Sequence, residues 1–406
     1  MTHSTSSSTS SLFASTGFRR YFLASCFSTF AIWISRFLLG WTAWALTESA
    51  FWVGAVSALF LAPTFMFSLV FGVVADRIDP LRGMYLTTAA QALIGVAAAV
   101  TAWLDLFTLP WLCALAAAIG MVTAAHHPMR LSLLPLLVER RHFAGAIGLS
   151  AMVFNTSRIL GPALAAFLLW WASTGLAFAV AAALYIATLL SLRQVTTLKP
   201  SQKEVRRSLW LELRAGLAFV RASQMIRLLM VLTMINGLYG RTIIEMLPAL
   251  TGQLLQGDAG TLAMVTAAAG LGSICGGLLV SRQRGTEAHL LGLVFVALLV
   301  SVFVALPILW VSTLVALGLM IFLLSLCMTV IGTGCQTALQ LSVADSFRGR
   351  VMSIWTVITM GMPALGAVLL GALADQLGMA IVLLVFALMA GAATVLLHAW
   401  RRFVGL

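Results

Sequence analysis

Charge is scarce in this sequence. Only 9% of its 406 residues are charged, whereas 61% are hydrophobic. A soluble protein of this length could not cover its surface with so few charges. The repeated apolar runs are long enough to cross a bilayer, and they lack the two-residue alternation of a membrane-spanning barrel. We therefore predict an all-α integral membrane protein.

Motifs for catalysis and nucleotide binding are missing too. The sequence contains no Walker motif, no nucleophile elbow and no HExxH. The five cysteines lie in apolar runs without metal-like spacing, so we expect no disulfide, no metal site and no cofactor. His126 and His127 are adjacent and cannot share a helix face, so we interpret them as a cytoplasmic helix end. The chain is not expected to be an enzyme or an ATP-driven pump.

What the sequence does contain is a series of hydrophobic helices. We predict twelve, over residues 20–46, 51–75, 82–104, 109–130, 144–170, 174–192, 226–251, 258–280, 288–309, 312–338, 349–372 and 378–400. They form two six-helix halves, residues 19–192 and 226–406. Residues 1–18, rich in Ser and Thr, are expected to form a disordered cytoplasmic tail.

The net charge of +12 does not indicate nucleic-acid binding, because the basic residues sort to one side of the predicted membrane. Of the 24 Lys and Arg residues, 21 lie in predicted cytoplasmic segments or at the helix ends that border them, and only Arg36, Arg158 and Arg241 lie deep within predicted helices. The others occupy the two ends, the connection 193–225 and every second loop. By the positive-inside rule, these segments and both termini are cytoplasmic in the cell's inner (plasma) membrane.

The connection 193–225 has an apolar face at helical spacing. Its members are Leu209, Leu213, Leu217 and Val220, and basic residues surround them. This pattern predicts a short amphipathic helix on the inner leaflet, with membrane lipids as its partners.

A short charged loop separates the second and third predicted helices, with the sequence Phe71-Gly-Val-Val-Ala-Asp-Arg-Ile-Asp-Pro-Leu-Arg82. It resembles the loop signature of the major facilitator superfamily at Gly72, Asp76, Arg77 and Arg82. The resemblance implies that these four residues control the gate between transport states. The superfamily's glycine after the arginine is replaced by Ile78-Asp79-Pro80, which changes the chemistry of the turn.

The fifth predicted helix keeps the spacing of the superfamily's antiporter signature. The matching positions are Gly148, Ser157, Gly161-Pro162 and Ala165-Ala166, with Ser157 and the alanine pair replacing glycines. Residues 127–135 and 155–164 are similar to the branch that contains the enterobactin exporter and drug-efflux proteins. The resemblance implies the major facilitator fold and a gating role for Gly161 and Pro162. A plain helix-packing stripe is the alternative interpretation of the small residues.

The second half of the sequence weakly repeats the first. A shift of 205 residues places Arg36 on Arg241 and Arg77 on Arg282, whereas Asp76 falls on Ser281. Such a two-fold repeat is typical of transporters that bind substrate between their pseudo-symmetric halves. The resemblance also implies that the first and seventh helices, which carry Arg36 and Arg241, line the central cavity.

Intramembrane charges identify the candidate site residues. Arg36 lies roughly 24 Å along its helix from Arg20, past the midplane, so it must face a cavity or a partner. We predict that Arg36, Arg158 and Arg241 bind substrate, because guanidinium groups suit anionic or catecholate-like oxygens. An ion cluster of Arg36, Arg241 and Glu245 is the alternative. Glu245, four residues after Arg241, is the candidate proton-coupling group.

Together these features predict a secondary active transporter working by alternating access. We expect a monomeric, proton-coupled exporter, an antiporter, of a small amphipathic molecule, either siderophore-like or drug-like as in multidrug resistance. The alternative is a transporter-like membrane receptor or assembly factor without transport. The expected partners are the small-molecule substrate, protons and lipids, without nucleic acid.

Overall fold

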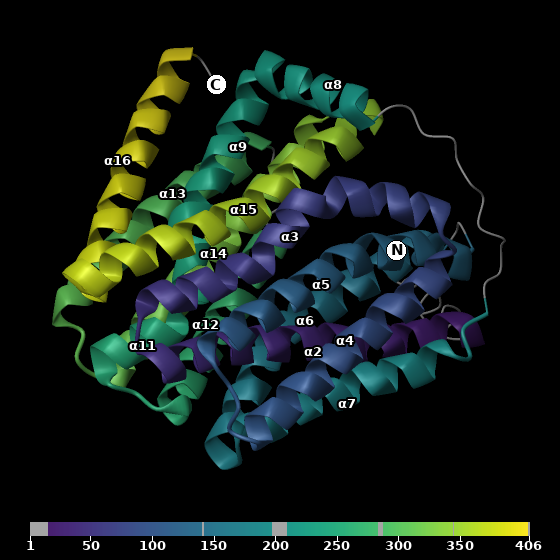
Figure 1. Cartoon of the computed structure of the whole chain (residues 1–406). Coiled ribbons are helices and arrows are strands. Elements are labelled where there is room, and N and C mark those ends of the chain that lie inside the picture. Colours follow the sequence, from purple (N-terminus) through teal and green to yellow (C-terminus); the bar gives the residue numbers. More distant parts are fainter. Residues whose placement is uncertain (1–14, 140–141, 197–208, 283–286, 344, 405–406) are drawn as a thin grey trace. The chain divides into compact units, whose positions relative to one another are not determined.

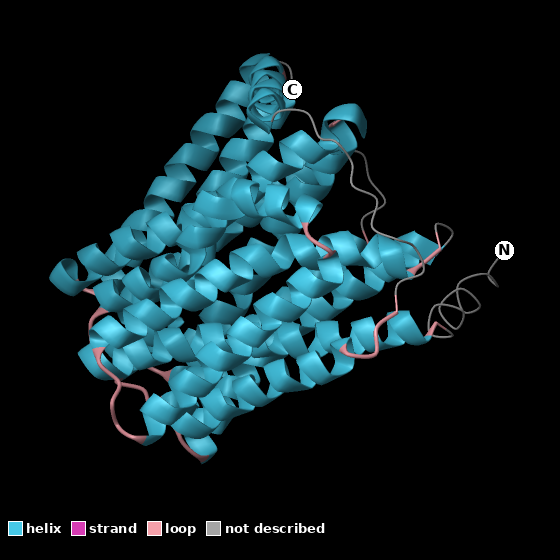
Figure 2. Cartoon of the chain, turned by 45° about the vertical axis from the view of Figure 1, so that its right-hand side comes forward, coloured by secondary structure: helices cyan, strands magenta, loops and turns pink. Residues whose placement is uncertain are grey.

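The computed structural model describes residues 15–139, 142–196, 209–282, 287–343 and 345–404. In these ranges the chain forms helices and short loops, and no residue in them belongs to a β-strand (Figure 2). The α-helices, labelled in Figure 1, are α2 (Thr16–Thr47), α3 (Ala50–Arg77), α4 (Pro80–Trp103), α5 (Leu109–Leu137), α6 (Phe143–Trp171), α7 (Thr174–Leu192), α8 (Leu209–Ala222), α9 (Gln224–Ile235), α10 (Thr242–Glu245), α11 (Leu247–Leu255), α12 (Ala259–Ser281), α13 (Glu287–Ala305), α14 (Leu314–Ser342), α15 (Asp345–Leu377) and α16 (Met379–Val404). A π-helix, η2 (Asn236–Arg241), and a 3-10 helix, η3 (Leu306–Trp310), complete the set.

Twelve helical segments in the described ranges are long and apolar enough to cross a membrane. They contain between 18 and 32 residues, and a bilayer needs about 20. A helix pairs its own backbone N–H and C=O groups, which find no hydrogen-bond partners in the hydrocarbon of the bilayer. The prediction of an all-α membrane protein with twelve spanning helices is confirmed.

Side-chain oxygens mark where several helices begin. Asp79, Ser173, Ser223, Asp258 and Thr313 each accept a hydrogen bond from a backbone N–H in the first turn of α4, α7, α9, α12 and α14. Such caps satisfy N–H groups that the helix leaves unpaired. At Asp258 the backbone N–H and the hydroxyl of Thr261 donate at 2.8 and 2.9 Å, and they hold the pKa of this carboxyl below its usual value.

The chain divides into two compact units. Unit 1 comprises Met1–Thr42 and Pro63–Val205. Within it α4 contacts both α5 and α7 (Figure 1). A side-chain carbon added at Gly95 of α4 would lie 3.2 Å from Cβ of Ala182 on α7, so small residues bring these two helices together.

Unit 2 comprises Ala43–Ala62 and Arg206–Leu406. Its α14 packs against α12 and α13, and α15 packs against η2 and α16. Gly272 and Gly276 of α12, one turn apart, face the backbone of α14 at Phe322 and Leu326. A side chain at either glycine would collide with that backbone, so this small-residue pair sets the helix separation.

The start of α3 belongs to unit 2 because Asp375, near the end of α15, caps it. The Asp375 carboxylate accepts hydrogen bonds from the Ser49 hydroxyl and from the backbone N–H groups of Ala50, at 2.7 Å, and Phe51, at 3.1 Å. Beside this cap, Gly371 of α15 packs on the backbone of Ala50. Ala43–Ala62 lie in the first half of the sequence but pack with the second.

The seventh predicted helix, 226–251, is interrupted. The chain runs through α9, the π-helix η2, α10 and α11, with a break at Met246 before Pro248. Gly237 and Gly240 sit in η2 against the side chains of Met362 and Met328, where a larger residue would not fit. Single-turn π segments inside α-helices are frequent at functional sites, and irregular backbone at membrane depth is tolerated where protein covers it.

Several predicted helix ends are wrong, and α14, α15 and α16 each extend four or five residues past the predicted end. α5 continues past residue 130 to Leu137, because apolar Leu133 and Leu134 extend its buried face, so Arg130 lies inside the helix. α2 begins at Thr16, inside the expected tail 1–18, because Phe18 is fully buried in the core of unit 1. α15 begins at Asp345, ahead of the predicted residue 349. Residues 1–14 lie outside the described ranges.

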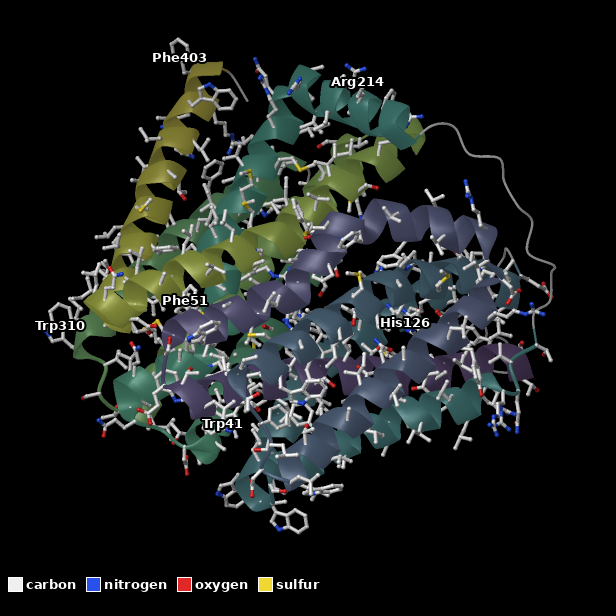
Figure 3. The ribbon with its side chains drawn as sticks, viewed as in Figure 1. Trp41, Phe51, His126, Arg214, Trp310 and Phe403 are labelled. Carbon is white, nitrogen blue, oxygen red and sulfur yellow. The ribbon has the colours of Figure 1, made fainter. Side chains whose placement is uncertain are left out.

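The connection between the halves contains α8, at the residues where an amphipathic helix is expected. α8 packs against α15: Phe219 stacks on Phe347 with ring centroids 4.5 Å apart, and the Arg350 guanidinium lies 5.2 Å from the Phe347 centroid. Leu217 is exposed, and so is Arg214, which points away from the helix (Figure 3). Leu209 and Leu213 lie in α8, but their side chains are outside the description.

The Asp375 cap leads to a stability prediction. Asp375→Ala removes all three hydrogen bonds at the start of α3, and we expect the free energy of unfolding to fall by about 1–2 kcal/mol, as for other lost caps. Asp375→Asn keeps one acceptor oxygen and should lose less. Thermal unfolding of the purified protein measures the effect, and Gln376→Ala at the exposed neighbour is the control. Equal melting temperatures for all four proteins would refute the capping role.

Candidate functional site

The signature loop is a two-residue turn. α3 ends at Arg77, and only Ile78 and Asp79 separate it from Pro80, the first residue of α4. Asp79 accepts a hydrogen bond from the Arg82 backbone N–H at 2.9 Å. An aspartate cap followed by proline is a favourable helix start, so Ile78-Asp79-Pro80 makes this turn without the superfamily's glycine.

The four predicted gating residues of this loop lie at adjoining helix ends. Arg77 is exposed in the last turn of α3 and Arg82 is exposed in the first turn of α4. Asp76 lies in the same last turn of α3, but its side chain is outside the description. A carbon added at Gly72 would meet no described atom within 4 Å, so no other backbone approaches Gly72 closely.

Arg36 stacks on a tryptophan one turn earlier in α2. Its guanidinium carbon lies 5.1 Å from the centroid of the Trp33 ring, a cation–π geometry. The same ring meets Phe154 of α6 edge-on, with centroids 5.7 Å apart and planes at 67°. Trp33 therefore connects the predicted substrate-binding residue to the helix that carries the antiporter-like spacing.

Gly161 makes room for this arrangement. A side-chain carbon at Gly161 would lie 2.7 Å from Cβ of Trp33, so any larger residue would push α2 and α6 apart. α6 continues as a helix through Pro162. Phe154, Arg158 and Gly161 recur at intervals of four and three residues, which places them on one face of α6.

Arg158 therefore faces α2 together with Arg36. The two side chains are both half-buried, and they lie close enough for their positive charges to repel each other. Like charges inside a membrane protein are costly, because hydrocarbon does not solvate them. An anion bound near both arginines would reduce their repulsion.

Two further hydrogen-bond donors lie in the same helix pair. The indole Nε1 of Trp33 and the hydroxyl of Ser157 are buried and have no hydrogen-bond partner among the described residues. Ser157 precedes Arg158, and its side chain is fully buried. Guanidinium and indole groups only donate, and a hydroxyl can donate, so this cluster suits a ligand rich in acceptor oxygens. We call Trp33, Arg36, Ser157 and Arg158 the donor cluster.

Unit 2 places its charged residues at the irregular part of the seventh span. Arg241 is the last residue of η2, Glu245 is the last residue of α10, and both are half-buried. Asn236, at the first position of η2, donates from its amide to the Met328 carbonyl at 3.4 Å, while its amide oxygen has no partner among the described residues. The Tyr239 hydroxyl donates to the Ser301 carbonyl at 3.0 Å. A direct Arg241–Glu245 pair stays a prediction.

The sequence predicted Arg36 and Arg158, and the structure brings them together in unit 1. It did not predict the roles of Trp33 and Ser157, since an apolar pattern alone cannot distinguish a packing tryptophan from one that faces a cation. The π segment had a detectable signal in Asn236-Gly237 and Gly240, residues that weaken a helix. In the described ranges, no group of His, Cys, Asp and Glu side chains forms a metal-binding cluster.

Comparison with known proteins agrees with this arrangement. The chain is 24% identical over 372 residues to a staphyloferrin A transporter of Staphylococcus aureus, which covers 88% of this chain and 90% of the relative. It is 26% identical over 364 residues to the enterobactin exporter EntS of Salmonella typhi, covering 88% of this chain and 85% of that protein.

Solved structures show the same fold. The nucleoside transporter NupG matches with a TM-score of 0.69 at 14% identity, over 93% of this chain and 98% of that chain. A bacterial homologue of the human lysosomal transporter Spinster matches with a TM-score of 0.71 at 14% identity, over 96% and 97%. The model of the transmembrane secretion effector family matches residues 7–403. The chain therefore belongs to the transmembrane secretion effector family of major facilitator superfamily transporters.

Proposed function

We propose that this transporter exports a small, oxygen-rich anionic molecule of the siderophore type, by proton-coupled alternating access. The donor cluster of unit 1 carries the proposal. Arg36 and Arg158 place two like charges side by side, and Trp33 and Ser157 add donors that no described residue accepts. Carboxylate or catecholate-like oxygens fit such a cluster better than an apolar or cationic molecule does. Arg241, at the equivalent position of the second half, is the corresponding cation of unit 2.

The relatives support this substrate class. Two relatives that match most of the chain are a staphyloferrin A transporter and an enterobactin exporter. Identity near one quarter does not transfer their substrates, so the chemistry of the donor cluster has to decide between a siderophore and a drug-like molecule. Export is the proposed direction because one of these relatives is an enterobactin exporter. The distribution of basic residues supports cytoplasmic termini.

The gate lies, in this proposal, at the signature loop. Gly72, Asp76, Arg77 and Arg82 surround the two-residue turn between α3 and α4, and a rigid turn transmits motion of one helix to the other. Gly161 and Pro162 act on the substrate side, where Gly161 holds α6 against Trp33. A tilt of α6 against α2 would then change the donor cluster itself.

An accumulation panel tests the function. Cells without their own exporters, expressing this protein, are loaded with iron-free enterobactin, iron-free staphyloferrin A or cationic drugs, and retention is compared with that of vector controls. We expect lower retention of a siderophore and unchanged retention of the drugs. Efflux confined to the drugs would replace the siderophore proposal with multidrug efflux. Proteoliposomes that show no counterflow of any compound would favour a receptor or assembly factor.

Binding by the donor cluster leads to a mutational prediction. Arg36→Leu and Arg158→Leu should each weaken siderophore binding about tenfold or more, since a charge-assisted hydrogen bond contributes roughly 1.5–3 kcal/mol. Arg158→Leu should also leave the melting temperature equal or higher, because it removes the repulsion with Arg36. Binding and melting of purified protein measure both effects, and Arg221→Leu at the exposed end of α8 is the control. Lower melting with unchanged binding would make these arginines structural.

Proton coupling at Glu245 leads to a second mutational prediction. An amide has the shape of a carboxyl group but cannot take up and release a proton. With an amide in place of the coupling carboxyl, substrate still exchanges across the membrane, but a proton gradient no longer drives its accumulation. Glu245→Gln should therefore keep substrate counterflow in proteoliposomes and lose the response to an imposed pH gradient. Glu48→Gln, at an exposed carboxylate, is the matched control. A normal gradient response in Glu245→Gln would place the coupling proton elsewhere.

A further inference from the structure

Unit 1 contains a buried polar ladder between α4 and α5, apart from the donor cluster. Thr87 and Gln91 extend from α4, and Thr123 and His126 extend from α5. The Thr87 hydroxyl oxygen lies 2.9 Å from Nδ1 of His126, and the Gln91 amide donates to the Thr123 hydroxyl at 3.4 Å. The intervals of four residues on α4 and three on α5 keep each pair on one helix face.

His126 is enclosed within the unit. Its side chain is only 8% exposed, and Figure 3 shows it among the helices rather than at an end of the bundle. The predicted helix end at residue 130 is wrong, because α5 continues to Leu137. Thr87 lies roughly 10 Å along α4 from Pro80, so His126 is about two turns from the level of the signature loop.

The hydrogen bonds of Thr87 determine which nitrogen of His126 carries the proton. The Thr87 hydroxyl has one hydrogen, and its oxygen lies 2.9 Å from the Gly83 carbonyl and 3.1 Å from the Met84 carbonyl. With this hydrogen directed to the α4 backbone, the hydroxyl oxygen accepts from Nδ1–H of His126. The lone pair is then on Nε2. Nε2 of His126 and the amide oxygen of Gln91 are both buried without a partner among the described residues.

We propose that His126 is a protonation site of the transport cycle, in unit 1, in addition to Glu245 in unit 2. This inference rests on the proposed proton coupling. A hydronium ion transfers a proton to the Nε2 lone pair: one O–H bond breaks, one N–H bond forms and a water molecule remains, and release reverses this step. An imidazolium has two donors, and here only Nδ1 has an acceptor, so the protonated form favours a different arrangement of α4 and α5.

Arg130 connects this site to the donor cluster. Arg130 and His127, both on α5, are the charged and titratable groups whose charges reach His126, while α4 contributes the uncharged Thr87 and Gln91. Arg130 donates from Nη1 to the Thr29 hydroxyl of α2 at 3.1 Å. A positive charge on His126, one turn from Arg130, would repel the Arg130 guanidinium and weaken its hydrogen bond to Thr29. Thr29 lies two turns before Arg36 on the same helix, so a shift of α2 reaches the substrate site.

A comparison of adjacent histidines tests the proposal. Wild type, His126→Gln and His127→Gln are reconstituted, and iron-free enterobactin and iron-free staphyloferrin A are the transport probes. His127 is exposed, so its variant is the matched control. We expect His126→Gln to keep counterflow and lose most of the stimulation by a pH gradient. His127→Gln should keep the stimulation, with at most a shift in the pH at which it is half-maximal, because the charge of His127 reaches His126. Thr87→Val, which removes the partner of Nδ1, should shift the pH at which stimulation is half-maximal.

The outcomes separate the two proposals. If wild type transports a probe without any response to the gradient, or transports neither, the proposed function fails. If wild type responds and His126→Gln responds equally, the His126 proposal is wrong. A measurement without substrate decides independently. In ¹⁵N-histidine NMR spectra of purified protein, the signal missing from His126→Gln should show the Nδ1–H form at neutral pH and convert to imidazolium as the pH is lowered. A signal that stays neutral throughout also overturns the proposal.

Discussion

Every polar side chain placed in hydrocarbon must be satisfied by the protein itself, and this constraint organises the molecule. Most hydroxyl groups meet it locally by donating to their own helix. Thr29 donates to the Ser25 carbonyl at 2.6 Å, and Ser35 and Thr88 bond in the same way four residues back. Among the described residues, eleven keep a buried side-chain N or O atom without a partner. Five of them lie at the donor cluster, the ladder and the π segment: Trp33, Ser157, His126, Gln91 and Asn236.

The helix count could be predicted from the sequence because length and hydrophobicity are properties of each segment alone. The small residues around Gly161 indicated a close helix contact, but the sequence did not indicate that Trp33 of α2 is the residue that Gly161 meets. The features that the sequence did not predict depend on contacts between residues far apart in the chain. The Asp375 cap joins residues 325 positions apart, and nothing near Ser49 or Ala50 in sequence indicates an acceptor. The interruption at η2 depends on Met328 and Met362 filling the space beside two glycines.

The two halves share one intramembrane arginine and differ in the charged residues near it. Arg36 and Arg241 occupy equivalent positions of the repeat, but their neighbours do not correspond. The counterpart of Glu245 at the same shift is Gly40, and the counterpart of Arg158, at the shift that aligns Pro162 with Pro363, is Thr359. Unit 1 therefore concentrates positive charge, whereas unit 2 carries a carboxylate beside its arginine. In the proposed function, unit 1 attracts the anion, and protons are exchanged at Glu245 of unit 2 and at His126 of unit 1.

The sign of these charges restricts how protons and substrate can be coupled. A cation and a proton can compete for one carboxylate, which gives exchange by simple displacement. An anion cannot be displaced in this way, because an added proton makes a site more positive and strengthens the attraction. For an exported anion, protonation must instead act by changing the helix arrangement that holds the arginines together. Arg130 offers such a connection, since it is fixed to α2 by Thr29 and lies one turn from His126 on α5. If the substrate is an anion and its export is coupled to protons, as proposed, these charges favour coupling through helix position over direct competition.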